Sequence, residues 1–188
     1  MARPSSPSPA LAWNAAAKSF HWGIAALILL QFVLGWLAAS WRLSPTKLDL
    51  FVWHKSIGML ILALVVLRLL NRLATRAPAL PAGMPAWERA AAHGSHVLLY
   101  GLMLALPLSG WIVSAAAGVP FRIFWRLPLP AIVGPDRQTA EFAAAVHFAL
   151  GIALVALLAL HIGAALRHHF AQRNAVLTRM LPARTPRT

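Results

Sequence analysis

Residues 142–166 read FAAAVHFALGIALVALLALHIGAAL, an apolar stretch whose only ionisable side chains are His147 and His161. About 20 apolar residues suffice for a helix to cross a bilayer, so this stretch predicts a membrane-spanning helix. The two histidines are fourteen residues apart, which places them on one helix face and roughly 21 Å apart along the axis. Because histidine is costly inside a span, this pattern indicates a function at each end of the helix.

Three further apolar stretches, residues 20–40, 50–70 and 97–117, are also long enough to cross a bilayer. The chain of 188 residues is 60% hydrophobic and only 11% charged, whereas soluble domains carry about 25% charged residues. This composition excludes an ordinary water-soluble enzyme. Irregular backbone is not tolerated next to lipid, so we predict an all-α fold, an integral membrane four-helix bundle. We interpret residues 18–181 as one domain, with a disordered tail at 1–17 and a C-terminal tail at 182–188.

The chain has 17 Lys and Arg against 4 Asp and Glu, a net charge of +13. The larger group of basic residues lies in or beside the N-terminal tail, the connection between the second and third spans, and the C-terminal tail: Arg3, Lys18, Arg68, Arg72, Arg76, Arg89, Arg167, Arg173, Arg179, Arg184 and Arg187. The smaller group lies on the other side: Arg42, Lys47, Lys55, Arg122, Arg126 and Arg137. Positive residues favour the cytoplasmic side, so both termini are predicted to be cytoplasmic. Nucleic acid is not needed as a partner to explain the charge.

On the outer side this topology leaves His54, at the start of the second span, to pair with His147. Gly58 follows His54 by four residues, and Gly151 follows His147 by the same spacing. Positions i and i+4 share a helix face, so a flat ring bound by either histidine would meet bare backbone. Glycine at such positions also serves close helix packing. Its repetition at both paired histidines favours a haem.

On the inner side His21, His93 and His96 are the candidate partners of His161. We favour His21 because it stands inside an apolar stretch, whereas His93 and His96 lie among Ala, Gly and Ser. Two imidazoles on opposite sides of one iron make a low-spin haem, while zinc sites take three or four protein ligands. The chain has no cysteine, so any haem would be held by histidine alone. With both axial positions filled, electron transfer is expected rather than oxygen binding.

The sequence resembles the bacterial cytochrome b561 family, four-helix di-haem proteins of the inner membrane, from residue 18 to residue 181. The resemblance rests on the segments SFHW (19–22), WHKSIG (53–58), AHGSH (92–96) with LPLSG (106–110), and on His147, His161 and RHHF (167–170). It implies two haem b groups, with ligands that map onto His21 and His161 inside and onto His54 and His147 outside. It also implies a location in the bacterial inner membrane, surrounded by lipid.

The resemblance further implies electron exchange with the quinone pool, with ubiquinone as acceptor and, in some members, superoxide as a one-electron donor at the outer face. Whether the chain acts by itself as a superoxide:ubiquinone oxidoreductase is left open. The alternative is an electron-relay cytochrome b subunit of a membrane-bound dehydrogenase or hydrogenase complex, in which it would dock to a soluble protein partner. A haem-free transporter is disfavoured because the spans lack carboxylates and broken-helix repeats.

Two groups of polar residues are candidates for the reaction itself. On the outer side Lys55, Arg122 and Arg126 would attract a small anion such as superoxide. They would equally suit haem propionates or lipid headgroups. On the inner side His168 follows His161 by seven residues, about 20° off its face. His168 and His96 are therefore candidates to contact either a quinone or a haem propionate.

Overall fold

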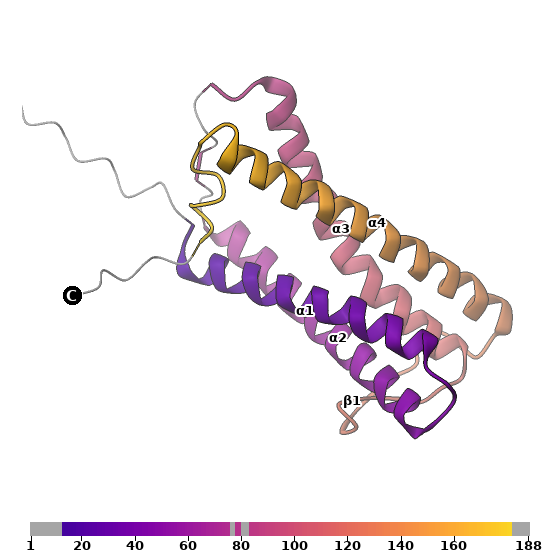
Figure 1. The fold of residues 1–188 in the computed structure, drawn as a ribbon. Coiled ribbons are helices and arrows are strands. Elements are labelled where there is room, and N and C mark those ends of the chain that lie inside the picture. The colour runs from indigo at the N-terminus through magenta and orange to yellow at the C-terminus, as the bar shows by residue number, and fades with distance from the viewer. Residues whose placement is uncertain (1–12, 76–77, 80–82, 182–188) are drawn as a thin grey trace, which may run out of the picture.

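The computed structural model describes residues 13–75, 78–79 and 83–181, and most of this part of the chain is helical (Figure 1). The helices are α1 (Ala15–Ser40), α2 (Pro45–Ala74), α3 (Ala86–Ala116) and α4 (Arg137–Phe170). Each is long and apolar enough to cross a membrane, which confirms the predicted all-α membrane fold. Of the two expected tails, residues 1–12 and 182–188 lie outside the described residues.

Each helix begins before its predicted span, and α1, α2 and α4 begin after a polar capping residue that lies beyond the apolar stretch. Asn14 accepts a hydrogen bond from the backbone N–H of Ala17 at 2.7 Å, so α1 begins inside the segment expected to be a disordered tail. Asp136 caps α4 through the N–H of Thr139 in the same way, at 2.7 Å. Such caps satisfy donors that have no partner within the helix. The apolar stretches therefore give the membrane spans, and the caps give the helix ends.

The longer helices also correct the placement of several histidines. The predicted spans, residues 97–117 and 142–166, leave His93 and His96 before the third helix and His168 and His169 after the fourth. They lie within α3 and α4 instead, because the polar segments that flank the apolar stretches continue the helical backbone. Their side chains therefore have directions fixed by these helices.

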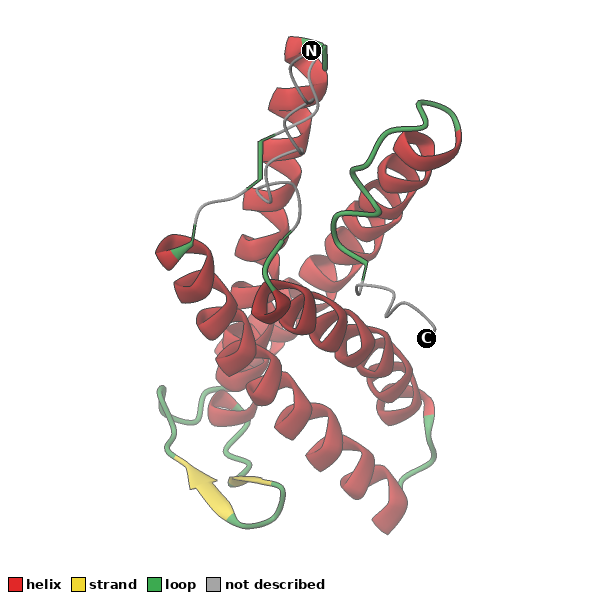
Figure 2. Ribbon diagram, turned by 90° about the vertical axis from the view of Figure 1, so that its left-hand side faces the viewer, coloured by secondary structure: helices red, strands yellow, loops and turns green. Residues whose placement is uncertain are grey.

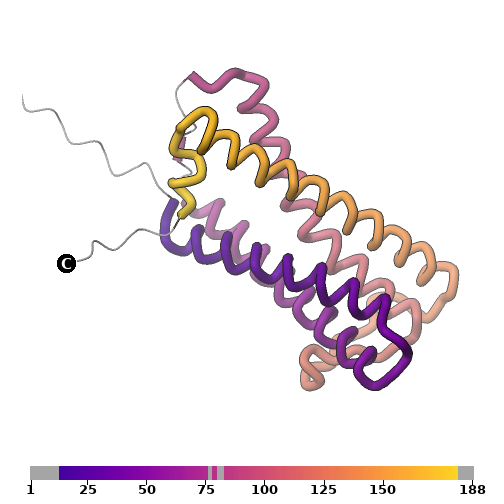
Figure 3. Tube along the Cα trace, in the orientation of Figure 1, coloured from indigo at the N-terminus to yellow at the C-terminus, as the bar shows by residue number. Residues whose placement is uncertain are grey.

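The four helices pack as two pairs. α1 lies along α2, α3 lies along α4, and α2 also contacts α3. The end at which α1 begins and α4 finishes is called the termini end, and the opposite end is called the hairpin end (Figure 3). The buried core is small and apolar, and it consists of Ile24, Ile28, Ile57, Ile61, Val65, Leu99, Met103 and Leu154. Many large apolar side chains on all four helices are exposed, as expected for surfaces that face lipid.

Between α3 and α4, β1 (Phe121–Ile123) and β2 (Leu127–Leu129) form an antiparallel hairpin at the hairpin end (Figure 2). Its turn holds Phe124 at φ 47° and Trp125 at φ 61°, a conformation that bulky side chains rarely adopt. Contacts with α2 hold the turn in place. The N–H of Phe124 donates to Oγ of the buried Ser56 at 2.8 Å, and the Trp53 ring lies edge-on to both aromatic rings.

At the termini end, the segment after α4 crosses back to the beginning of α1. The indole N–H of Trp22 donates to the Met180 carbonyl at 2.9 Å. The Arg179 side chain donates to the carbonyl of Ala79, between α2 and α3, at 2.6 Å. The residues that follow α4 thus join three elements at this end of the bundle.

We predict that Ser56→Ala destabilises the protein by about 1–3 kcal/mol, because the N–H of Phe124 loses its acceptor. For a chain of this size each kcal/mol lowers the midpoint of thermal unfolding by about 2–4 °C. The measurement is a thermal melt of the purified protein in detergent. The control is Ser40→Ala, because the exposed Ser40 hydroxyl bonds only to a carbonyl of its own helix. Equal melting temperatures for the two variants would contradict the assigned role of Ser56.

Candidate functional site

At the hairpin end, His54 from α2 and His147 from α4 face each other between the two helix pairs. Their ring centroids are 6.2 Å apart, and the planes of the rings make an angle of 81°. Both side chains are partly buried. The structure therefore brings together the two histidines that the sequence assigned to the outer side.

His147 is held by the segment LPLSG (106–110) of α3. Its Nδ1 lies 3.0 Å from the Leu106 carbonyl oxygen and 3.0 Å from Oγ of Ser109. The Ser109 hydroxyl itself donates to that carbonyl, so Nδ1 carries the ring proton and donates it to Leu106. Nε2 then keeps a free lone pair, which is the arrangement found in metal-binding histidines.

Glycine on a neighbouring helix makes room for each of these rings. A Cβ atom on Gly110 of α3 would stand 3.1 Å from Cε1 of His147, and one on Gly35 of α1 would stand 3.0 Å from Cε1 of His54. Both distances are shorter than ordinary van der Waals contact, so a larger residue would displace the ring. In each helix pair, a glycine on one helix therefore leaves room for the imidazole of the other.

Around His54 some polar groups have no protein partner. The Gln31 side chain of α1 donates to the His54 carbonyl oxygen at 2.8 Å. Oε1 of Gln31 and Nδ1 of His54 are buried, and neither has a hydrogen-bond partner among the described residues. Buried polar groups without partners cost about 1–3 kcal/mol each. Their presence beside a facing pair of imidazoles is typical of a site built for a ligand.

At the termini end, three imidazoles from three helices meet. The His161 ring centroid in α4 lies 6.3 Å from that of His21 in α1 and 5.6 Å from that of His96 in α3. Arg68 of α2 donates to Nδ1 of His21 at 3.0 Å. Arginine cannot accept a hydrogen bond, so the neutral His21 ring carries its proton on Nε2. Metal binding through Nε2 therefore requires Arg68 to release this ring.

The spacing of the rings tests whether a haem fits. A metal–imidazole bond is about 2 Å long, and the ring centre lies about 1 Å beyond the nitrogen, so rings on opposite sides of one iron have centroids about 6 Å apart. The pairs His54–His147 and His21–His161, at 6.2 and 6.3 Å, match this spacing better than His96–His161 at 5.6 Å. Within the described residues no group of three or more His, Cys, Asp or Glu could hold a metal ion. Two-ligand haem sites fit the donors that are present.

Gly58 and Gly151, which the sequence predicts beside a flat ring bound by the histidines, do not contact the imidazoles themselves. A Cβ on Gly58 would meet the side-chain nitrogen of Gln31 at 3.2 Å, and one on Gly151 would meet no protein atom within 4 Å. Gly35 and Gly110 do lie against the imidazoles, but i, i+4 spacing indicates only neighbours on the same helix and does not predict them. The segment LPLSG carries part of the family resemblance, and the sequence does not predict its contact with His147.

The basic candidates all lie at the hairpin end. Lys55 is partly buried in α2, with Nζ 5.6 Å from the centroid of the Phe121 ring. Arg122 and Arg126 are exposed, one in β1 and the other in the turn of the hairpin. The structure thus gathers the three cations around the hairpin that packs on α2 beside His54.

The inner candidates lie at the termini end. His96 borders a small cavity together with Arg68, Arg72 and Tyr100. His168 is partly buried near the end of α4, where its Nδ1 lies 2.8 Å from the Asn174 side chain. The structure therefore places both candidates on the same side of the molecule as His161, but in different surroundings.

The chain is similar to proteins of one family over most of its length. The family model described as prokaryotic cytochrome b561 matches residues 12–183. The chain is 35% identical to cytochrome b561 homolog 2 of Escherichia coli over 170 residues, which cover 87% of each chain. It is 31% identical to cytochrome b561 homolog 1 of the same organism over 141 residues, 75% of this chain and 80% of the relative. It is 28% identical to the "Probable superoxide oxidase CybB" of Yersinia pestis over 165 residues, 86% of this chain and 91% of that one. The chain therefore belongs to the prokaryotic cytochrome b561 family, whose members are membrane electron-transfer proteins with b-type haem.

Proposed function

We propose that this chain is a di-haem b-type cytochrome that transfers electrons between a one-electron donor and the quinone pool of a bacterial inner membrane. The observation that carries the proposal is the pair of imidazole sites along one uninterrupted helix, α4, each with the spacing that a haem iron requires. When bound, haem supplies reversible one-electron exchange. The proposed ligands are His54 with His147 and His21 with His161.

The chain's own residues hold the two imidazoles of the hairpin end in place. Leu106 and Ser109 fix the tautomer and direction of His147, and Gly35 allows α1 to pack against the His54 ring. The helices that carry both pairs are long and apolar enough to cross a membrane, and the imidazoles are partly buried. Ligands held in fixed positions suit a protein that exchanges electrons without binding oxygen.

At the hairpin end we propose a small anionic donor, with superoxide as the first candidate. Lys55, Arg122 and Arg126 are gathered there, and a cluster of cations raises the encounter rate with an anion. A superoxide oxidase is also the printed name of the Yersinia pestis relative. This end would face the periplasm, because the larger group of Lys and Arg residues lies at or beyond the termini end, which would make both termini cytoplasmic.

At the termini end we propose the quinone site, with ubiquinone as acceptor. Reduction of a quinone consumes protons as well as electrons, so its site needs groups that can carry protons. His96 and His168 are at this end. The cavity bordered by His96, Arg68, Arg72 and Tyr100 provides both hydrogen-bond donors and an aromatic surface for a polar headgroup.

The ligand assignment predicts which haem each histidine variant loses. His54→Ala and His147→Ala should each remove the same haem, while His21→Ala and His161→Ala should each remove the other, so the haem-to-protein ratio falls from two to one. Haem extraction measures the haem-to-protein ratio, and electron paramagnetic resonance of the oxidised protein shows which haem is lost. His93→Ala is the control, because that exposed ring bonds only to a carbonyl of its own helix. Loss of the inner haem in His96→Ala, with retention in His21→Ala, would show that His96 is the ligand.

The glycine contacts predict that one methyl group disturbs the outer haem. In Gly110→Ala the new Cβ would stand 3.1 Å from Cε1 of His147, so the ring must move and its hydrogen bond to Leu106 weakens. Overpacking of this kind costs about 1–3 kcal/mol. We expect lower occupancy or an altered spectrum of the outer haem only, and the same result for Gly35→Ala. Gly101→Ala in α3 is the matched control, since its Cβ would meet nothing within 4 Å, and a Gly110→Ala protein that equals this control contradicts the prediction.

The proposed donor site predicts that neutralising Lys55, Arg122 and Arg126 to glutamine slows superoxide-driven ubiquinone reduction at low ionic strength. Electrostatic steering is worth about 10-fold or more in encounter rate, and salt screens it. The variant should therefore be slower by about that factor, and its rate should depend less on salt. A charge-matched control replaces Lys18, Arg89 and Arg173 at the termini end. Equal rates for the two triple variants would remove the steering role, and no turnover by the intact wild-type protein would favour the electron-relay alternative.

A further inference from the structure

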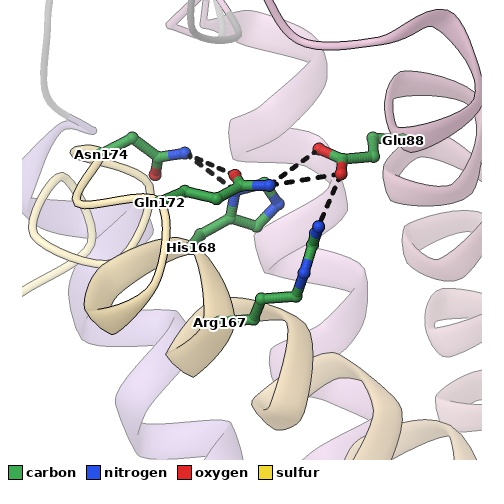
Figure 4. A network of polar contacts seen from close by, with 5 residues as sticks. All are labelled: Glu88, Arg167, His168, Gln172 and Asn174. Atoms are coloured by element: carbon green, nitrogen blue, oxygen red, sulfur yellow. Dashed lines mark hydrogen bonds and ion pairs between the residues drawn. The ribbon is translucent and has the colours of Figure 1, made fainter.

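The end of α4 and the turn after it carry a chain of polar contacts that starts at a buried carboxylate (Figure 4). Glu88, in the first turn of α3, is 8% exposed and accepts a hydrogen bond from Nη1 of Arg167 at 2.9 Å. The Gln172 side-chain nitrogen lies 3.2 and 3.4 Å from the two carboxylate oxygens. A carboxylate paired with arginine only accepts hydrogen bonds, so the amide group of Gln172 must turn its nitrogen toward Glu88.

The orientation of Gln172 then determines the orientation of Asn174. With its nitrogen on Glu88, Gln172 presents Oε1 to the Asn174 side-chain nitrogen at 3.1 Å. A backbone donor fixes the same orientation from the other side, because the N–H of Val176 donates to Oδ1 of Asn174 at 3.2 Å. In an isolated side-chain amide, the positions of oxygen and nitrogen could be exchanged by turning the group over. Here the contacts with Gln172 and with Val176 both require Nδ2 of Asn174 to face away from Val176.

The amide nitrogen of Asn174 lies 2.8 Å from Nδ1 of His168. An amide nitrogen can only donate, so Nδ1 of His168 accepts, and the single proton of the neutral ring is on Nε2. The backbone keeps the two residues together, since the N–H of Asn174 donates to the His168 carbonyl at 3.0 Å. No group in the described part of the chain forms a hydrogen bond with Nε2 of His168, so this N–H is available to a ligand.

We propose that Asn174, oriented through Gln172 by Glu88 and by the N–H of Val176, is a positioning residue that holds His168 as the Nε2–H tautomer, so that His168 donates a hydrogen bond to a quinone carbonyl at the termini end. The hydrogen bond to the quinone, the second half of this inference, rests on the quinone site proposed above. The assignment of the His168 tautomer, the first half, does not. Asn174, Gln172 and Glu88 thus act on the quinone by setting the tautomer of His168, and they do not contact the quinone themselves.

Nuclear magnetic resonance tests the tautomer directly. Protein labelled with ¹⁵N-histidine and reduced with dithionite is diamagnetic when its haem is six-coordinate, and two-bond ¹H–¹⁵N correlations then report which ring nitrogen carries the proton. Spectra are recorded at about pH 8, above the ordinary histidine pKa of about 6.5, and His168→Gln assigns the signals of His168. The expected result is a proton on Nε2. A proton on Nδ1 of His168 in the wild-type protein would overturn the inference.

Asn174→Asp separates positioning from a structural role. The carboxylate still accepts the Val176 N–H, so the turn is kept, but an oxygen now faces Nδ1 and the ring proton should move there. If Asn174 served only to form the turn, the tautomer would stay on Nε2, and that result would also overturn the inference. Thr178→Ala is the control in the same turn, because the Thr178 hydroxyl bonds only to the Ala175 carbonyl and its loss should leave the His168 signals unchanged.

Kinetics with a short-chain ubiquinone test the second half. Asn174→Asp should raise the KM for this quinone about tenfold, equivalent to about 1.4 kcal/mol, with a smaller effect on kcat and no change in haem content. A switched tautomer with an unchanged KM would overturn the hydrogen bond to the quinone while supporting the positioning of His168. Absence of quinone reduction in the wild-type protein would count against the proposed function instead, and the tautomer result would stand.

Discussion

A polar side chain within an apolar, lipid-facing helix has to find its partner on another helix, and the arrangement of this bundle depends on that constraint. Helix association in lipid gains little from the hydrophobic effect, so hydrogen bonds and small residues set the packing. Here each neighbouring pair is joined in this way. Gln31 of α1 reaches the His54 carbonyl of α2, and Arg68 of α2 reaches His21 of α1. The His147 ring of α4 is bonded to the Leu106 carbonyl of α3, and Arg167 reaches Glu88 across the same two helices at the termini end.

At the hairpin end, packing within each helix pair directs the imidazoles across the bundle. Within each helix pair one helix supplies a histidine at the hairpin end and the other supplies the glycine that accommodates its ring, Gly35 for His54 and Gly110 for His147. Because each ring is supported from its own pair, the two rings can face each other without direct packing between α1 and α4. A cofactor that binds both rings would then join the two pairs. Binding of such a cofactor would therefore be coupled to bundle assembly, since the pairs share a small apolar core.

The sequence predicts the four helices, the pairing of His54 with His147 and the gathering of candidate partners around His161, because apolar length and helical periodicity determine them. It does not predict contacts between helices that depend on rotation about the helix axis. The role of Gly110 and Ser109 beside His147 is of this kind, as is the contact of Arg68 with His21. Nor does composition indicate that residues 121–129 form a hairpin, since its turn adopts φ values that Phe124 and Trp125 rarely take and that α2 enforces.

The two ends of the bundle differ in chemistry, and this difference bears on the proposed direction of electron transfer. At the hairpin end, the polar contacts of the imidazoles involve uncharged groups, Leu106, Ser109 and Gln31, and the cations Lys55, Arg122 and Arg126 lie at the same end. At the termini end the imidazoles lie beside Arg68, and a carboxylate, two amides and His168 form a connected network. A donor that gives up only an electron needs nothing more than attraction and access, whereas an acceptor that takes up protons needs hydrogen-bonding groups of fixed orientation. Among the described residues, the connected network that includes a carboxylate lies at the termini end, and it supports the proposed flow of electrons from the hairpin end toward that end.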